Sequence, residues 1–370
     1  MGDQPQRPLR VLFGIGGIGS GGSETQMTEL AVRIDAERIR AAVVISRLGD
    51  RDDRCRRIEA AGIPVLWLGP MPPIVVIRGI VRMWRFARVI GRLRPDVIYA
   101  WLEESSVFLV PLAKLWGIPV VVARRNVIGA RAERFAPVRW AIRQAEAHAD
   151  LVTGNSEAVL AIARSRGVDP ARLRLVRNGH PERPVLPVPP VPPVVLGYLA
   201  RFRVEKGHHR LLDALEHVRA ATPWAVRLGG DGPLLEEIRR EVRARGLNDR
   251  IIFVGDVTEA SEFWSRAHVA VLLSDHEGSP NALMEAAMAG RPLVATDAGG
   301  TAELVRPDGG ILVPLGPPEE IAAALTRLID DHELREDLGR GARAAVLSRH
   351  AMQTSVDGHI AVLEEAGLLG

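Results

Sequence analysis

Hydrophobic residues form two kinds of segment that alternate along most of the chain. Short unbroken runs rich in β-branched residues are typical of strands buried on both faces, and the longer segments between them carry apolar residues at helical spacing. The runs are LRVLFG, AAVVIS, PVLWLG, DVIYA, IPVVVA and DLVTGN in the first half, and VVLGYLA, AVRLGG, RIIFVG, VAVLLS, PLVAT and GILVP in the second. Repeated strand–helix units predict parallel sheets with ligands at the carboxyl ends of strands. We therefore expect an α/β protein of two Rossmann-like domains that face each other across a cleft.

A proline-rich stretch separates the two halves. Residues 181–193, PERPVLPVPPVPP, contain seven prolines in thirteen positions, which predicts a stiff, extended linker. At 370 residues the chain is long enough for two domains. We place the first domain at residues 1–183, the second at 184–350 and a last helix at 351–370, which can pack on either domain, including back on the first.

Cysteine content and hydropathy indicate the cellular compartment of the protein. Cys55 is the only cysteine, which excludes an internal disulfide and a cysteine-based metal site and favours a reducing compartment. No apolar run approaches the length of a membrane span, and the start, MGDQPQRPLR, is unlike a signal peptide. We therefore expect a cytoplasmic protein, either soluble or peripheral at the inner face of the cell membrane.

The net charge of +3 hides an asymmetry between the halves. Residues 1–185 hold 29 Lys and Arg against 18 Asp and Glu, a net charge of +11, and the remainder carries −8. The first half should therefore meet an anionic partner, such as a membrane surface or a phosphorylated acceptor. Nucleic acid is not the expected partner, because aromatic residues make up only 4% and no binding module is recognised.

Residues 76–95, VIRGIVRMWRFARVIGRLRP, form a basic segment with helical spacing of its apolar residues. One helical face carries Ile77, Ile80, Val81, Trp84, Ala87 and Ile90, and another carries Arg78, Arg82, Arg85 and Arg92. We interpret this pattern as an ordinary half-buried helix. The alternative is a basic helix that lies in a membrane interface, which would suit a lipid-linked acceptor.

The stretch EGSPNALMEAAMAG, residues 277–290, holds two glutamates around the start of an otherwise apolar helix. Ser279 can cap this helix and Pro280 suits its first turn. Asn281 and Glu285 are four residues apart and share one face. Amide groups at the helix start make an anion site, so Glu277 and Glu285 could flank a sugar that carries a phosphate. An E-x7-E spacing also arises by chance, and such glutamates are then solvated.

The glycine-rich stretch GIGGIGSGGSE, residues 14–24, follows the first predicted strand. Gly14, Gly16 and Gly19 match G-x-G-x-x-G, which makes an NAD(P)-dependent oxidoreductase a rival interpretation. However, glycines continue to Gly22, and the first acid after the second strand, Asp50, is later than that fingerprint requires. A longer loop lets backbone approach a bulky ligand closely; an ordinary flexible turn is the other alternative.

Two further segments place cations at strand ends. In LGYLARFRVEKGHHRLLDAL, residues 196–215, Arg201 and Lys206 could reach a diphosphate. Lys206 is conspicuous because, of 48 basic residues, only Lys114 and Lys206 are lysine. In IPVVVARRNVIG, residues 118–129, the side chains Arg124, Arg125 and Asn126 end a buried strand, where they either bind an acceptor's anionic group or are solvated surface.

Together these segments resemble a known family. The resemblance rests on GGSE, NSEAVLAIARSRGVDPARLRLVRNGHP, ARFRVEKG, GGDGP, FVGDV and EGSPNALMEAAMAGRPLVATDAGGTAELV, in that order over nearly the whole chain. This combination is similar to glycosyltransferase family 4, the glycosyl transferases group 1, and implies the GT-B fold. One departure is that many members have a histidine after the strand matching PVVVA, where this chain has Arg124, Arg125 and Asn126.

The resemblance implies a role for each matching residue. Arg201, Lys206 and Glu277 would form the catalytic group, with the two cations on the donor's diphosphate and Glu277 on the transferred sugar. Glu285 would accept from ribose hydroxyls. The remaining donor-binding positions would be Gly278, Ser279, Pro280, Asn281 and, beside the base, Gly255; Gly21 and Gly22 would approach phosphate and acceptor.

The implied reaction is transfer of a hexose from a UDP- or GDP-type sugar with retention of anomeric configuration. Neither metal nor cofactor is implied, no nucleophile is assigned, and the acidic pairs at 52–53 and 330–331 are interpreted as solvated. The acceptor is expected to be a glycan or lipid-linked intermediate of cell-surface polysaccharide synthesis. A noncatalytic sugar-nucleotide-binding protein is an alternative. Phosphorylase chemistry would need a cofactor on one of only two lysines.

Overall fold

The structure is a computed structural model that describes residues 7–19, 21–47, 52–127 and 135–370. The first six residues of MGDQPQRPLR, Ser20 of the glycine-rich stretch, and Asp50 lie outside this description. The chain divides into two compact units: unit 1 comprises Met1–Gly179 and Gln353–Gly370, and unit 2 comprises His180–Met352. Among the residues described, no helix is long and apolar enough to cross a membrane.

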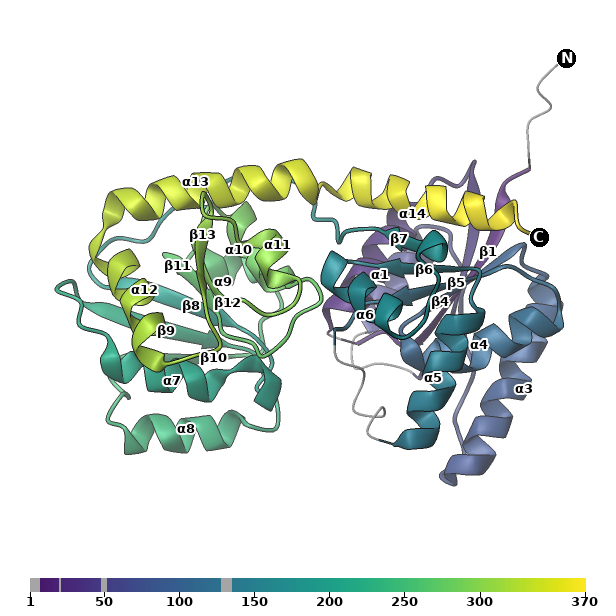
Figure 1. Cartoon of the computed structure of the whole chain (residues 1–370), viewed down its shortest axis with the longest axis horizontal. Coiled ribbons are helices and arrows are strands. Elements are labelled where there is room, and N and C mark those ends of the chain that lie inside the picture. Colours follow the sequence, from purple (N-terminus) through teal and green to yellow (C-terminus); the bar gives the residue numbers. More distant parts are fainter. Residues whose placement is uncertain (1–6, 20, 48–51, 128–134) are drawn as a thin grey trace, which may run out of the picture. The chain divides into compact units, whose positions relative to one another are not determined.

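Unit 1 is built on a seven-stranded parallel sheet of order β3-β2-β1-β4-β5-β6-β7 (Figure 1). Its strands are β1 (Leu9–Gly17), β2 (Ile39–Arg47), β3 (Val65–Trp67), β4 (Val97–Trp101), β5 (Val120–Arg124), β6 (Leu151–Gly154) and β7 (Leu173–Leu175). Its helices are α1 (Gly22–Arg33), α2 (Asp52–Ala60), α3 (Val75–Leu93), α4 (Glu103–Leu115), α5 (Ala136–His148), α6 (Glu157–Ser165) and α14 (Met352–Gly367), with a 3-10 turn, η2 (Pro170–Arg172). Every residue of β4, β5 and β6 is buried, as expected for strands covered on both faces.

Unit 2 contains a six-stranded parallel sheet of order β10-β9-β8-β11-β12-β13. Its strands are β8 (Val194–Leu199), β9 (Trp224–Gly229), β10 (Ile251–Gly255), β11 (Val269–Leu272), β12 (Leu293–Thr296) and β13 (Gly310–Val313). Its helices are α7 (His208–His217), α8 (Leu235–Ala244), α9 (Ala260–Trp264), α10 (Asn281–Met288), α11 (Thr301–Leu304), α12 (Pro318–Asp330) and α13 (His332–Arg349), with a 3-10 turn, η3 (Val204–Lys206). Two Rossmann-like domains with parallel sheets are therefore confirmed.

Each sheet has one point where its strand order reverses. In unit 1 this switch point lies between β1 and β4, and in unit 2 it lies between β8 and β11. Ligands of such sheets bind outside the carboxyl ends of the strands at that point. The candidate ligand-binding residues are therefore those that follow β1, β4, β8 and β11.

The last helix, α14, crosses back and belongs to unit 1. Its buried His359 lies against the sheet, with Nδ1 2.9 Å from the Tyr99 hydroxyl on β4. Arg125, after β5, lies 3.2 Å from the Nε2 atom of the same imidazole. Burial holds the pKa of His359 well below its ordinary value. A neutral imidazole thus joins the last helix to two strands of the first unit.

The proline-rich stretch is not a free linker but packs along unit 2. The buried Arg291 donates to the carbonyls of Leu186 and Pro187, at 3.1 and 2.6 Å. The Nε2 atom of His268 lies 3.0 Å from the Pro189 carbonyl oxygen. Composition alone indicates an extended backbone, and the buried side chains that hold it come from distant parts of the sequence.

Unit 2 should lose stability in mild acid because it buries neutral histidines. Burial lowers the pKa of His208 to about 4, and its ring stacks on Phe202 at a centroid distance of 4.2 Å. The unfolded chain takes up a proton near pH 6.5 but the folded one does not, so the stabilisation is complete above that pH and is lost as pH falls towards 4. The thermal midpoint of His208→Phe, which retains a stacking ring, should fall less between pH 7 and pH 4.5 than that of the wild type. An equal fall in both proteins would contradict this assignment.

Candidate donor-binding site

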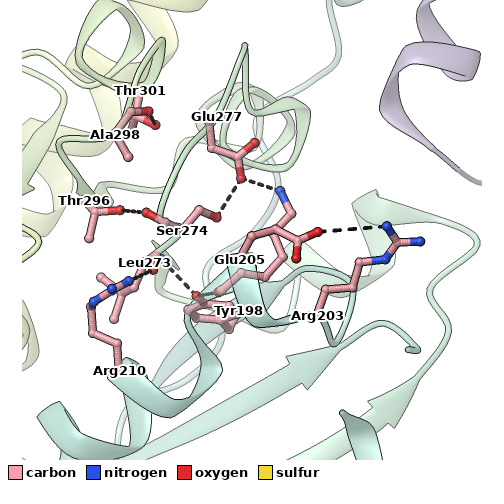
Figure 2. Close-up of polar contacts among 11 residues, drawn as sticks. Tyr198, Arg203, Glu205, Arg210, Leu273, Ser274, Glu277, Thr296, Ala298 and Thr301 are labelled. Carbon is pink, nitrogen blue, oxygen red and sulfur yellow. Dashed lines mark hydrogen bonds and ion pairs between the residues drawn. The ribbon is translucent and has the colours of Figure 1, made fainter. Parts of the chain in front are cut away.

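Polar side chains from two segments, the turn η3 and the loop after β11, meet at the switch point of unit 2 (Figure 2). The ammonium group of Lys206, at the end of η3, lies 2.5 Å from Oε1 of Glu277. The Ser274 hydroxyl, just after β11, donates to the same oxygen at 2.7 Å. The two charged side chains are largely buried, with 25% of Lys206 and 11% of Glu277 exposed. The cluster therefore combines a cation and a hydrogen-bonded carboxylate at the edge of the sheet.

Hydrogen bonds to the backbone fix the position of Lys206. The fully buried Tyr198, on β8, donates its hydroxyl proton to the Lys206 carbonyl and accepts from the Leu273 amide at 3.0 Å. Burial raises the pKa of Tyr198, so the hydroxyl stays protonated and can donate. Gly207 follows with φ +64°, and a Cβ atom there would lie 1.8 Å from the Leu273 carbonyl oxygen. Only glycine allows this close approach of η3 to the end of β11.

The loop that carries Glu277 is held at several points. Arg210 donates to the Leu273 carbonyl at 2.5 Å and to the Asp275 carboxylate at 2.7 Å. The Thr296 hydroxyl, on β12, donates to the Ser274 carbonyl at 2.5 Å. The Gly300 amide donates to the Glu277 carbonyl at 2.8 Å. These contacts orient the carboxylate before any ligand arrives; Figure 2 shows those of Arg210 with Leu273 and of Thr296 with Ser274.

Helix α10 begins immediately after this loop. Its N-cap is Pro280, without a side-chain cap hydrogen bond, so the predicted capping role of Ser279 is wrong. Around the helix all residues from 283 to 288 are buried except the half-buried Glu285, which shares its face with the half-buried Asn281. An apolar helix thus keeps one partly open face, and that face carries the second glutamate.

Two other predicted donor residues lie at neighbouring strand ends. Arg201 follows β8 and is exposed. Gly255 ends β10 with φ +75°, and its carbonyl accepts from the Gly230 amide at 2.7 Å. Unit 2 therefore gathers all the predicted donor residues at or near the carboxyl edge of one sheet.

In unit 1 the glycine-rich stretch is not arranged as a dinucleotide fingerprint. Gly14 and Gly16 lie within β1, and α1 begins only at Gly22. Gly21 is the N-cap, and a Cβ atom there would lie 2.2 Å from a carboxylate oxygen of Glu24. Gly21 and Gly22 therefore bring backbone, without side chains, to the start of α1.

The basic pair at the end of β5 is buried, which excludes the solvated-surface interpretation of Arg124 and Arg125. Arg124 forms an ion pair with Glu146, whose side chain is 2% exposed. Arg125 donates to Asn178 at 3.1 Å and stacks over the Trp101 ring at 4.0 Å. The neighbouring Asn126 is half-buried. Acceptor binding by these three residues stays a prediction.

The sequence interpretation missed several residues at the switch points. Ser274 and Tyr198 support the Lys206–Glu277 pair, and both lie on or directly after a predicted strand. In unit 1, Leu102 has φ +69° and ψ +160°, a backbone conformation costly for a leucine. Glu103, the next residue, is only 5% exposed. All four residues lie on or just after β4, β8 or β11, the strands at which the strand order of a sheet reverses, and this position could have identified them.

No group of three or more His, Cys, Asp or Glu residues that could hold a metal ion occurs among the residues described. The carboxyl edge of the unit 2 sheet carries the cations Lys206 and Arg201, the carboxylate of Glu277 and the start of α10. These groups fit an anionic ligand that also carries hydroxyl groups.

Two Rossmann-like domains, each built on a parallel sheet, are the architecture of the GT-B fold. The sequence family described as "Glycosyl transferases group 1" matches residues 193–331, and the "Glycosyl transferase 4-like domain" matches residues 21–179. The chain therefore belongs to the group 1 glycosyltransferases, glycosyltransferase family 4.

Known proteins with similar sequences and structures agree with this assignment. The chain is 29% identical over 279 residues to the lipopolysaccharide core biosynthesis glycosyltransferase LpsD of Rhizobium meliloti, covering 75% of this chain and 77% of that protein. It is 24% identical over 317 residues to the putative glycosyltransferase EpsF of Bacillus subtilis, covering 78% and 79%. The structure of Anabaena Alr3699/HepE with UDP and glucose has the same fold, with a TM-score of 0.81 at 21% identity over 96% of this chain and all of that one.

The close approach at Gly207 can be tested against a matched glycine. Gly207→Ala should destabilise unit 2 by more than about 2 kcal/mol and weaken binding at the site, because the new methyl group collides with the backbone of Leu273, directly after β11. Gly246→Ala is the control, since Gly246 has a similar φ of +67° but open space around its Cβ position. Equal unfolding midpoints for the two variants in urea would show that the contact does not constrain the site.

Proposed function

We propose that this glycosyltransferase binds a nucleoside-diphosphate sugar in unit 2 and transfers its hexose with retention of configuration. The observation that carries this proposal is the cluster of Lys206, Glu277 and Ser274 next to the uncapped start of α10. A diphosphate needs cations and amide donors, and a sugar needs carboxylate acceptors. Both kinds of group converge at this edge.

Charge stabilisation of the leaving group is the central chemical role. The diphosphate gains negative charge as the glycosidic bond breaks, and Lys206 and Arg201 stabilise that charge together with the amides at the start of α10. Lys206 pairs with Glu277 in the structure. When a donor phosphate binds the ammonium group of Lys206, the carboxylate of Glu277 loses this partner and can accept hydrogen bonds from the sugar hydroxyls. Binding of the diphosphate therefore makes Glu277 available to the sugar.

The other predicted site residues have proposed contacts with the donor or the acceptor. Glu285 accepts from the ribose hydroxyls, since it lies on the open face of α10. Amides of Gly278, Ser279 and Asn281 surround sugar and phosphate, whereas Pro280 has no amide proton and shapes the turn. Gly255 lies beside the base. Gly21 and Gly22 approach the phosphate and acceptor from unit 1, with Arg124, Arg125 and Asn126 near the acceptor.

The acceptor is proposed to be a glycan or lipid-linked intermediate of cell-surface polysaccharide synthesis, handled at the cytoplasmic face of the membrane. Support comes from the lipopolysaccharide core role in the name of the Rhizobium meliloti relative. UDP and glucose bound in the Anabaena protein favour a UDP-sugar among the donors. The excess of positive charge in residues 1–185 suits an anionic acceptor. The charge that a metal would otherwise provide comes from Lys206 and Arg201.

Donor binding can be tested by thermal unfolding with UDP, GDP, ADP, CMP or NAD in EDTA. A ligand at a hundred times its dissociation constant should add about 2.7 kcal/mol of stability. One nucleoside diphosphate should shift the midpoint of the wild type and of Lys114→Ala, but not of Lys206→Ala, because only Lys206 belongs to the site. Lys114, the other lysine, pairs with Asp150 in unit 1. A shift by NAD alone, or none at all, would refute the donor site, and abolition of the shift by EDTA would refute metal independence.

Retention is tested by the configuration of the product, and the role of Glu277 by the kinetics of a variant. Proton NMR should show that an α-linked donor yields an α-linked product. Glu277→Gln should lower kcat about a hundredfold without weakening UDP binding, because Lys206 is then released from its pair. A β-linked product would exclude retention. Loss of UDP binding with normal kcat would place Glu277 on the nucleotide instead of the sugar.

A further inference from the structure

Helix α3 of unit 1 leaves much of its apolar face exposed. Its buried residues are Phe86 and Ile90, so the expected half-buried helix is found only in its second half. Large apolar side chains of the first half are exposed to solvent: Val76 (72%), Ile77 (45%), Ile80 (65%) and Trp84 (55%). Exposed apolar side chains gathered on one helix face mark an interaction surface.

An apolar groove lies beside these residues, where α3 packs against α4. Its volume is about 520 Å³, and its lining includes Met83, Trp84, Ala87 and Phe108. Phe108 of α4 stacks with Phe86 of α3 at a centroid distance of 6.2 Å, which places the two helices side by side (Figure 1). The groove therefore extends the exposed apolar face of α3 towards α4.

Positive charge surrounds this apolar surface. The helix carries five arginines and no acidic residue; they are Arg78, Arg82, Arg85, Arg88 and Arg92. Within the described part of the chain none of the five forms an ion pair with a carboxylate. Arg82 and Arg88 lie over the rings of Phe108 and Trp84, at 5.1 and 4.9 Å. Guanidinium groups thus border the apolar face without being neutralised.

We propose that α3 docks on an anionic lipid bilayer, with Ile80 and Trp84 in the boundary between headgroups and acyl chains and the arginines on lipid phosphates. Arg78 donates to the Pro72 carbonyl at 3.0 Å and Arg85 to the Pro70 carbonyl at 2.8 Å, so these contacts leave the positive charges uncompensated by a carboxylate. Apolar residues with an indole, beside arginines that have no carboxylate partner among the described residues, have the chemistry of an interfacial helix. A second copy of the chain is a poorer occupant, because a two-fold contact would set five arginines against five. This surface goes beyond the proposed reaction, and its test needs no donor.

The apolar contribution is measured by co-sedimentation with phosphatidylcholine vesicles that contain about 30% phosphatidylglycerol. The wild-type protein should bind, and Ile80→Ser with Trp84→Ser should lower the affinity at least about tenfold. The matched control is Leu115→Ser with Trp116→Ser, at the end of α4, where the side chains are 77% and 45% exposed. The control should bind as the wild type does. Its circular dichroism and that of the test variant should match the wild type.

The charge contribution uses a second pair of variants with equal loss of net charge. Arg88→Gln with Arg92→Gln should weaken binding to the anionic vesicles at least about tenfold. Arg56→Gln with Arg164→Gln, exposed arginines on other helices of unit 1, should have little effect.

Three results would overturn the proposal. They are absence of vesicle binding by the wild type, equal loss in test and control variants, and a dimer that dissociates on Ile80→Ser with Trp84→Ser. The last result would identify a second copy as the occupant. Vesicle binding without any nucleotide effect would instead leave the surface standing and count only against the donor site.

Discussion

Strands buried on both faces are the constraint on which both units depend. Every residue of β4 and β5 in unit 1, and of β11 and β12 in unit 2, is buried. Such strands cannot carry unpaired polar groups along their length without a large desolvation penalty. Polar side chains therefore appear where the strands end. In each sheet the ligand-binding crevice lies between the two neighbouring strands at which the strand order reverses: β1 and β4 in unit 1, and β8 and β11 in unit 2.

The two buried arginines of unit 1, Arg124 and Arg125, are stabilised in different ways. Arg124 faces a carboxylate, Glu146. Arg125 has no carboxylate partner among the described residues and relies on the Trp101 ring, Asn178 and a neutral His359. A guanidinium suits this role because it is weakly hydrated and stacks on aromatic faces. For His359 to accept from Arg125 at Nε2, its proton must be on Nδ1, directed at the Tyr99 hydroxyl. The position of α14 is thus linked to the protonation state of one imidazole.

The sequence predicted the architecture well because burial leaves a strong pattern. All twelve predicted strands occur, whereas β7 (Leu173–Leu175) was not predicted, because Arg174 interrupts its apolar run. Long-range partners leave no such pattern. Nothing near residues 181–193 indicates that Arg291 and His268 hold that stretch on unit 2. Similarly, strand-end position predicted Lys206 and Glu277, but the Tyr198 hydroxyl that fixes the Lys206 backbone comes from a residue whose apolar neighbours make it look like core. The exposure of α3 was foreseen only in the alternative interpretation, an interfacial helix, since amphipathic periodicity does not show what covers a helix face.

Under the proposed function, lysine at position 206 suits a site that has one state without donor and one with donor. In a chain that otherwise uses arginine for nearly every cation, a guanidinium here would grip both oxygens of Glu277 in a planar fork. An ammonium contacts one oxygen, which Ser274 shares, and it can turn on a flexible stem. Its backbone is fixed by Tyr198 and Gly207, so only the end of the side chain needs to move. We infer that the pair holds the cation in place before donor binding and releases it at little cost when a phosphate arrives, which a bidentate arginine pair would resist.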